Sequence, residues 1–259
     1  MNTPTDRVLA RITDPTTATL DLVLFPGAGN GPSAFSGWQR LVPPGWRVAA
    51  VRLPGRESRA GEPFAPSVPA AVDEVVPALR AWHLPDAPLV YLGHSMGAWF
   101  ALETALRVTP DLLVPVNSGP REGPLEYGEP DVDLLRKHTH QQGIGADIDP
   151  ELLDEVVEAT AAVMRGDTGT GNGYLPPTAV LSCDVVSYHG REDPAAGGSW
   201  ARYTRGRTDE VEVGGDHHFV KRAPEELIRD LERRVRRLPG GAGLPGNGTR
   251  RENDRGDQD

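Results

Sequence analysis

Leu-Val-Tyr-Leu-Gly-His-Ser-Met-Gly, at positions 89–97, is the stretch that decides the fold of this chain. Four apolar residues lead into a Gly-x-Ser-x-Gly run, and a helix-like stretch follows at 98–103. A sharp turn from strand to helix strains the serine backbone, and glycines two residues away on either side let the two elements approach without Cβ clashes. The pattern predicts a nucleophile elbow, with Ser95 as a nucleophile at the edge of a sheet. A buried serine in a tight turn is the alternative.

A serine hydroxyl attacks only when a base takes its proton, and in the α/β-hydrolase arrangement an acid and then a histidine follow the serine along the chain. A β-branched and aromatic run at 184–189 is followed by the carboxylates of Glu192 and Asp193. Both stand where a loop leaves the carboxyl end of a strand, which is the position expected for the acid. We favour Asp193 over Glu192.

The base is expected in the next segment. A short alternating run at 211–213 breaks at two glycines and leads to the pair His217 and His218. A single His or Asp on a loop is usually solvated surface, but a serine, an acid and a histidine in this order, each at a strand end, are typical of a catalytic triad. One of the two histidines therefore completes a triad with Ser95 and Asp193.

Catalysis also needs hydrogen-bond donors aimed at the oxygen that becomes negative in the tetrahedral intermediate. One is the backbone N–H of Met96. The other is expected where the apolar run 20–25 leads into the small residues of 26–31, and we assign it to the N–H of Gly27 or Ala28. A dinucleotide site is the rival interpretation of this loop, but the spacing is G-x-G-x-G, and no carboxylate stands ready for a ribose hydroxyl after the next strand.

The composition fits one globular enzyme domain. The chain has 259 residues, 38% of them hydrophobic, and a formal net charge of −10, which opposes binding to nucleic acid. No apolar run is long enough to span a membrane, so we expect a cytoplasmic protein. Cys183 is the only cysteine, so no internal disulfide can form, and we interpret it as a small core residue. His138 and His140 have no further ligand cluster beside them, so we expect no metal.

Strand and helix patterns alternate, which predicts an α/β fold with a mostly parallel central sheet flanked by helices. The expected strands lie at about 20–25, 46–53, 88–92, 112–117, 184–189 and 210–213, and the expected helices near 68–83, 96–108, 199–206 and 224–237. We expect a single domain over 1–238. Residues 239–259 are rich in glycine and charge, which predicts a disordered tail.

The alternation is interrupted at about 120–177, where we expect a helical lid insertion. Asp149 before Pro150 predicts a helix start, and Gly166 is a plausible stop. Apolar residues recur at helical spacing between them, which favours either core packing or the lining of an acyl channel. They are Leu152, Leu153, Val156, Val157, Thr160, Val163 and Met164.

Five motifs together resemble the type II thioesterases, which are stand-alone α/β-hydrolases of polyketide and nonribosomal peptide pathways. The resemblance runs from about residue 20 to 237, and its Leu-Pro-Gly-Arg-Glu segment discriminates better than the serine motif. The motifs are Leu-Phe-Pro-Gly-Ala-Gly at 24–29, Arg-Leu-Pro-Gly-Arg-Glu-Ser-Arg at 52–59, Gly-His-Ser-Met-Gly-Ala at 93–98, Gly-Arg-Glu-Asp-Pro at 190–194 and Gly-Asp-His-His-Phe at 215–219.

The resemblance implies that Ser95 is the nucleophile, Asp193 the orienting acid and His217 the base. The family's histidine is commonly followed by two apolar or aromatic residues, and His218 stands in the first of those places, so His218 remains the alternative base. The implied substrate is an acyl thioester on the phosphopantetheine arm of an acyl or peptidyl carrier protein, and the enzyme needs no cofactor of its own. We expect a monomer that removes stalled acyl groups.

Carrier proteins in such systems tend to be acidic, which conflicts with this chain's negative charge. Arg52, Arg56 and Arg59 fall after the second expected strand, on the same face as Ser95, and are candidates for a docking patch; a solvated loop is the alternative. Two other functions stay open. One is a carboxylesterase or lipase with the same triad, and the other is a non-catalytic homologue that binds carrier proteins.

Overall fold

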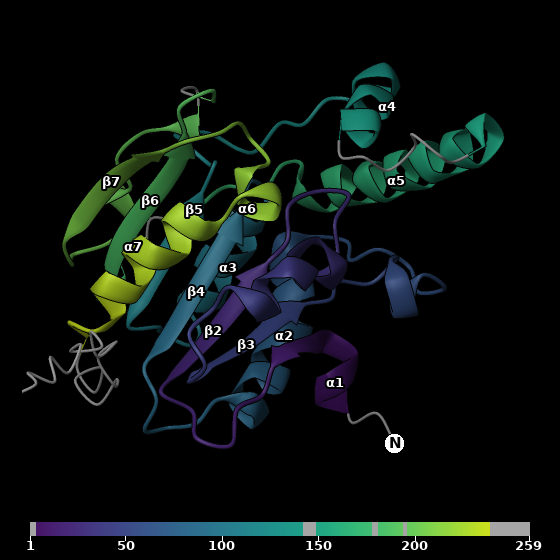
Figure 1. Ribbon diagram of the computed structural model, residues 1–259. Coiled ribbons are helices and arrows are strands. Elements are labelled where there is room, and N and C mark those ends of the chain that lie inside the picture. The colour runs from purple at the N-terminus through teal and green to yellow at the C-terminus, as the bar shows by residue number, and fades with distance from the viewer. Residues whose placement is uncertain (1–3, 142–148, 178–180, 194–195, 239–259) are drawn as a thin grey trace, which may run out of the picture.

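The computed structural model describes residues 4–141, 149–177, 181–193 and 196–238. Their strands form one sheet in the order β1-β3-β2-β4-β5-β6-β7 (Figure 1). Only β1 runs antiparallel to its neighbour, and every other pair is parallel. The strands are β1 (Leu9–Thr13), β2 (Leu20–Phe25), β3 (Trp46–Val51), β4 (Leu89–His94), β5 (Leu112–Val116), β6 (Asp184–Gly190) and β7 (Thr208–Val213).

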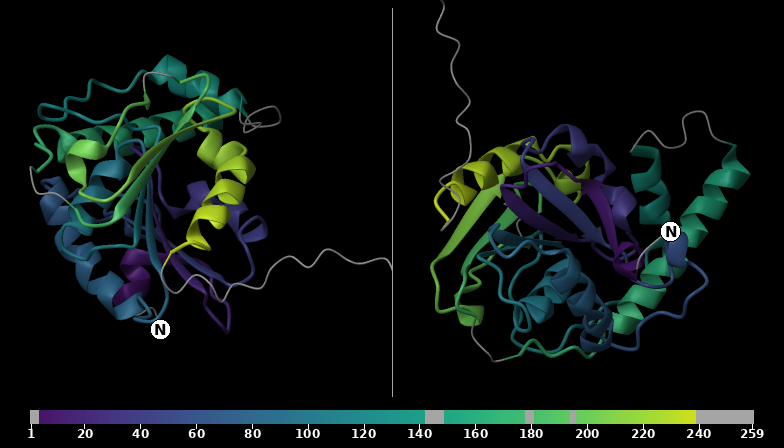
Figure 2. Two further views of the ribbon diagram at one scale, coloured as in Figure 1. Left: turned by 90° about the vertical axis from the view of Figure 1, so that its left-hand side faces the viewer. Right: turned by 90° about the horizontal axis from the view of Figure 1, so that it is seen from below.

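Helices cover both faces of the sheet, because residues of both parities along the central strands are apolar and buried. Val23 and Phe25 face one core with α2 (Val68–Trp82) and α3 (Gly97–Ala105). Leu22 and Leu24 face the other core with the 3₁₀ helix η1 (Pro32–Arg40), α6 (Phe219–Arg222) and α7 (Glu225–Val235). Figure 2 shows the sheet between α7 on one side and α2 and α3 on the other.

The predicted α/β fold is confirmed, and each of the six expected strands is present with bounds that differ by a few residues at most. The sequence did not predict β1, α1 (Pro4–Val8), η1, the short helix η2 (Glu57–Arg59) or α6. The helix expected at 199–206 is wrong, because only η4 (Ala201–Tyr203) forms there. Its extension is prevented by Thr204, whose hydroxyl donates to backbone oxygens of 181 and 183, and by Arg205, whose N–H donates to Leu181.

The insertion between β5 and β6 carries two further helices, α4 (Val132–Gln141) and α5 (Pro150–Gly171), which pack on each other beside the sheet (Figure 1). The predicted start of α5 is confirmed, since the Asp149 carboxylate accepts the Glu151 N–H at 2.8 Å. The predicted stop at Gly166 is wrong. Gly166 faces Phe64, and a Cβ there would lie 2.4 Å from ring carbons, so this glycine serves close packing within a continuing helix.

The predicted tail at 239–259 falls outside the described residues. In the part of the chain that the structure describes, no helix has both the length and the apolar character needed to cross a membrane.

Candidate functional site

Ser95 lies in the turn between the end of β4 and the start of α3, as the Gly-x-Ser-x-Gly run predicts. Its φ is +52°, in the left-handed region that non-glycine residues rarely adopt. A Cβ at Gly93 would lie 2.5 Å from the backbone of Ala98, and one at Gly97 would lie 2.2 Å from the carbonyl oxygen of Phe25. Both positions therefore require glycine, and the chain presents a strained, partly exposed serine at the carboxyl edge of the sheet.

Asp193 and His217 follow β6 and β7, which are parallel neighbours, so their loops meet at the same edge of the sheet. The Nδ1–H of His217 donates to Oδ2 of Asp193 at 2.5 Å. The ring of His217 also lies 5.1 Å from the ring of His94, the residue next to Ser95. The structure thus places the His217–Asp193 pair beside the turn that carries Ser95. Of the histidine pair, His217 is the one whose ring pairs with Asp193.

The backbone of His217 is held by two groups that the sequence analysis did not single out. Its carbonyl oxygen accepts one hydrogen bond from Nε2 of His94 and one from Nδ2 of Asn117, each at 2.8 Å. Burial lowers the pKa of His94 well below its usual value, so this imidazole is neutral and its single proton lies on Nε2.

Asn117 is the residue directly after β5 and is buried with φ +48°. Its Oδ1 accepts the N–H of Gly190 at 2.9 Å, and its own N–H donates to Tyr188. It therefore ties the ends of β5 and β6 to the histidine loop. An asparagine after an apolar run is also an ordinary turn signal, and nothing in the sequence separates the two roles.

The loop 26–31 approaches Ser95 from the end of β2. A Cβ on Gly27 would lie 3.3 Å from the Cβ of Ser95. The N–H of Asn30 donates to the carbonyl of Gly27, and Gly29 has φ +74°, which makes a tight turn that favours glycine at its third position. Within the described residues, the N–H groups of Gly27, Ala28 and Met96 donate to no protein group. These three amides are free to bind a negative oxygen.

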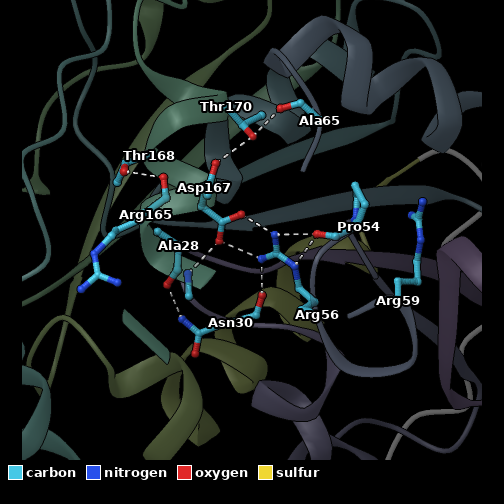
Figure 3. Close-up of polar contacts among 12 residues, drawn as sticks. Ala28, Asn30, Pro54, Arg56, Arg59, Ala65, Arg165, Asp167, Thr168 and Thr170 are labelled. Carbon is cyan, nitrogen blue, oxygen red and sulfur yellow. Dashed lines mark hydrogen bonds and ion pairs between the residues drawn. The ribbon is translucent and has the colours of Figure 1, made fainter. Parts of the chain in front are cut away.

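Two buried charges hold this loop, as Figure 3 shows. Oδ2 of Asp167, on α5, accepts the Gly29 N–H at 2.8 Å, and Nη1 of Arg56 donates to the Asn30 carbonyl at 2.9 Å. The two side chains also pair with each other through both carboxylate oxygens. From the other side, Nζ of Lys221 donates to Oδ1 of Asn30 at 3.2 Å.

The predicted docking patch is contradicted for Arg56 and Arg59, which are only 5% and 2% exposed. Arg59 donates to the carboxylates of Glu62 and Glu74 and to a backbone carbonyl. Guanidinium groups this deeply buried and paired with carboxylates inside the molecule present no surface charge to a partner. Arg52 is partly exposed, but its guanidinium is directed at Glu57 and at the carbonyls of residues 6 and 7.

The apolar stripe of α5 has no single environment. Leu153 and Val157 are buried, whereas Leu152 is 50% exposed and Val156 is exposed as well. Further along the helix, Met164 lies against the loop, because a Cβ on Gly29 would be 2.4 Å from its Cγ. The second half of the stripe therefore adjoins the Ser95 site, and the first half does not share that packing.

Metal ligands do not gather in the described part of the chain, where no group of three or more His, Cys, Asp or Glu could hold an ion. The side chains of His138 and His140 lie outside the described residues. Cys183 is buried, as its interpretation as a core residue predicts, and burial raises the pKa of its thiol to about 11.

Comparisons with known proteins agree on one family. The model of the thioesterase domain matches residues 21–235. The chain is 30% identical over 229 residues to the medium-chain S-acyl fatty acid synthase thioesterase of Rattus norvegicus, covering 81% of this chain and 84% of that one. It is 29% identical over 226 residues to thioesterase PikA5 of Streptomyces venezuelae, covering 81% and 79%. Its structure resembles that of RedJ, a thioesterase from the prodiginine biosynthetic pathway in Streptomyces coelicolor, with a TM-score of 0.68, 26% identity and coverage of 84% and 91%.

Proposed function

The chain belongs to the thioesterase domain family, and on this basis we propose that it is a type II thioesterase. It hydrolyses acyl thioesters held on the phosphopantetheine arm of acyl or peptidyl carrier proteins in polyketide or nonribosomal peptide synthesis. The likeness to PikA5 and to RedJ, which acts in a biosynthetic pathway, supports this assignment. The observation that carries the chemistry is the hydrogen bond from His217 to Asp193 beside the strained Ser95.

In the proposed first half-reaction, Nε2 of His217 takes the proton of the Ser95 hydroxyl, and the serine oxygen attacks the thioester carbonyl. Asp193 accepts the Nδ1–H bond, which fixes the ring and stabilises the imidazolium. The oxygen of the tetrahedral intermediate accepts bonds from Met96 and from Gly27 or Ala28. The C–S bond then breaks, and the departed thiolate takes the proton from the His217 imidazolium, which makes the imidazole neutral again for the second half-reaction. An aliphatic thiol has a pKa of about 8.5, so the thiolate leaves with little need for a general acid.

In the second half-reaction, His217 takes a proton from water, and the hydroxide oxygen attacks the acyl–serine ester. The same amides stabilise the second oxyanion. The C–O bond to Ser95 breaks, and His217 returns the proton to the serine oxygen. The products are a carboxylate and a free carrier thiol. Nothing in this cycle requires a metal or an organic cofactor of the enzyme itself.

The proposal is tested with carrier proteins charged with acetyl, propionyl, malonyl, longer acyl and aminoacyl groups, with release followed by mass spectrometry. We expect release from at least one carrier and none above background with Ser95→Ala, because the nucleophile is lost. Matched oxygen esters of the same acyl groups are run in parallel. Faster turnover of the esters than of every thioester would instead identify a carboxylesterase.

The two histidines are separated in the same assay. His217→Ala should lose at least about a thousandfold in kcat, whereas His218→Ala should stay within about tenfold of the wild type, because Asp193 pairs with His217. The reverse result would move the base to His218.

A further inference from the structure

A buried ion pair joins the lid helix α5 to the loop beside Ser95 (Figure 3). Asp167, on α5, is 1% exposed, and Arg56, from the segment before η2, is 5% exposed. All five N–H donors of the guanidinium have acceptors: two bonds go to the Asp167 carboxylate, one to the Asn30 carbonyl and two to the Pro54 carbonyl. The pair is therefore complete within the chain and has no donor left for a substrate or a carrier protein.

The same pair forms hydrogen bonds with two adjacent residues of the loop 26–31. The carboxylate accepts the Gly29 N–H at 2.8 Å, while the guanidinium donates to the Asn30 carbonyl at 2.9 Å. Because the Gly29 amide is already engaged, it cannot serve as a donor to substrate. The amides of Gly27 and Ala28, the two residues before it, are left free in the described structure. The pair thus engages the Gly29 amide and leaves free the amide of Gly27, which lies next to Ser95.

Stability alone does not account for such a pair. Taking two charges out of water costs several kcal/mol per ion, and well-packed apolar side chains of similar volume often give an equally stable protein. Burial raises the pKa of Asp167 because it disfavours the charged carboxylate, and the charge of Arg56 opposes that rise. What apolar side chains cannot supply is directional bonds to the Gly29 N–H and the Asn30 carbonyl.

We propose that Arg56 and Asp167 are positioning residues, which hold the Gly27 and Ala28 amides in line with the developing oxyanion only while α5 is seated on the loop. The inference rests on the proposed function, since it assumes that Ser95 attacks a carbonyl. It also links the lid to the chemistry: a movement of α5 that separates Asp167 from the Gly29 N–H releases the loop. Met164, which packs against Gly29 from the same helix, moves with it.

The test is Asp167→Asn, which keeps the shape of the side chain and removes its charge. We expect kcat for acyl-thioester hydrolysis to fall about tenfold to a hundredfold with KM within about threefold, because the donors bind the transition state more strongly than the substrate. Labelling of Ser95 by a fluorophosphonate should slow by a similar factor. In Arg56→Gln combined with Asp167→Asn, kcat should fall no further than in the worse single variant, because the two residues act as one unit.

Asp21→Asn is the matched control. Asp21 is also fully buried, pairs with both ends of an arginine fork (Arg47) and accepts a backbone N–H from Leu84, but it lies near the amino end of β2, away from Ser95. This variant should lose thermal stability and keep the wild-type kcat and labelling rate. A wild-type rate in Asp167→Asn, or an equal loss in Asp21→Asn, would show that the Arg56 pair only stabilises the fold.

Two further measurements cover the cases in which Asp167→Asn does not fold or the wild type hydrolyses no thioester. If Asp167→Asn does not fold, Arg56→Lys carries the test, since a lysine keeps the charge and cannot reach Asn30, Pro54 and Asp167 together. We expect it to slow labelling several-fold, and a wild-type rate would overturn the proposal. If the wild type is labelled but hydrolyses no thioester, the proposed function fails, while the ratio of labelling rates still decides whether the pair positions the loop.

Discussion

Lys221 is a partly buried cation next to the proposed site. Its ammonium donates to Oδ1 of Asn30 at 3.2 Å, and the nearby carboxylate of Asp216 pairs with Arg222. Burial, together with the nearby charge of Arg222, lowers the pKa of Lys221 from its ordinary value to about 8. At neutral pH the desolvated charge of Lys221 therefore lowers the stability of the fold. Its hydrogen bond to Asn30 holds the loop 26–31 in addition to Asp167 and Arg56.

This cost predicts a specific pH dependence of stability. The lysine of the unfolded chain keeps its proton up to about pH 10.4, whereas the folded one releases it near 8, so between these values the unfolded state binds more protons. The unfolding free energy of the wild type should consequently rise, relative to Lys221→Met, from about pH 7.5 to about pH 9.5. Urea unfolding of both proteins at several pH values measures the difference. A constant difference between the wild type and Lys221→Met over this range would contradict the lowered pKa of Lys221.

Sequence patterns predict some residues of the site and not others. Ser95, Asp193 and His217 each follow an apolar run, and their order along the chain is a recognisable pattern. Asp167 lies 138 residues from the Gly29 amide that it binds, inside a helix where an acidic residue usually faces water. Its burial is created by the docking of α5 on the loop, which is a tertiary event. For the same reason the sequence does not disclose the burial of Arg56, whereas Arg59 is buried by its pairing with Glu62 and Glu74.

At the level of elements, α5 shows why a glycine is a weak stop signal. Gly166 and Gly169 both lie inside the helix, which ends only at Gly171. Gly166 faces Phe64 at a distance that no Cβ could occupy, whereas a Cβ on Gly169 would meet nothing within 4 Å. The first glycine permits contact between the lid helix and the segment before α2, and the second has no packing role in the described structure.

The two glycines therefore predict opposite effects of the same substitution. Gly169→Ala should raise the unfolding free energy by about 0.5–1 kcal/mol, because alanine favours the helix and finds open space. Gly166→Ala gains the same helix preference but forces Phe64 to move, and we expect a net loss of about 1–3 kcal/mol. Chemical denaturation of the two variants measures both. Equal stabilisation by the two alanines would show that Phe64 yields without cost.

The elements that sequence predicted well are those buried on both sides. β2, β4 and β5 are buried throughout and mostly apolar, and helices with a regular apolar face follow β3 and β7. β1 escaped detection because it is a short edge strand of mixed polarity, paired on one side only. α4 escaped because none of its described side chains is fully buried, so its sequence carries no strong periodic signal.

Across the whole molecule, burial is concentrated in the sheet and thins out toward the lid. Every residue of β2, β4 and β5 is buried, whereas only Leu153 and Val157 are buried among residues 150–160 of α5. The second half of α5 is different, because Asp167 bonds to the loop 26–31 and the Thr170 hydroxyl donates to the carbonyl of Ala65. The lid is therefore fastened at one end, next to Ser95, and lightly packed at the other (Figure 1).

Local opening follows buried contacts, so hydrogen exchange should divide the molecule along this gradient. We expect the amides of β2, β4 and β5 to exchange most slowly, those of α4 and of 150–160 to exchange fastest among the helices, and those of 161–171 to be intermediate. In Asp167→Asn, the fast-exchanging region should extend through 161–171 while the sheet keeps its protection, because the ionic fastening to Arg56 is lost. Mass spectrometry of peptic fragments measures these rates. Uniform protection along α5 in the wild type, or unchanged protection of 161–171 in the variant, would mean that the lid is held by packing and that its charged contacts with the loop are dispensable.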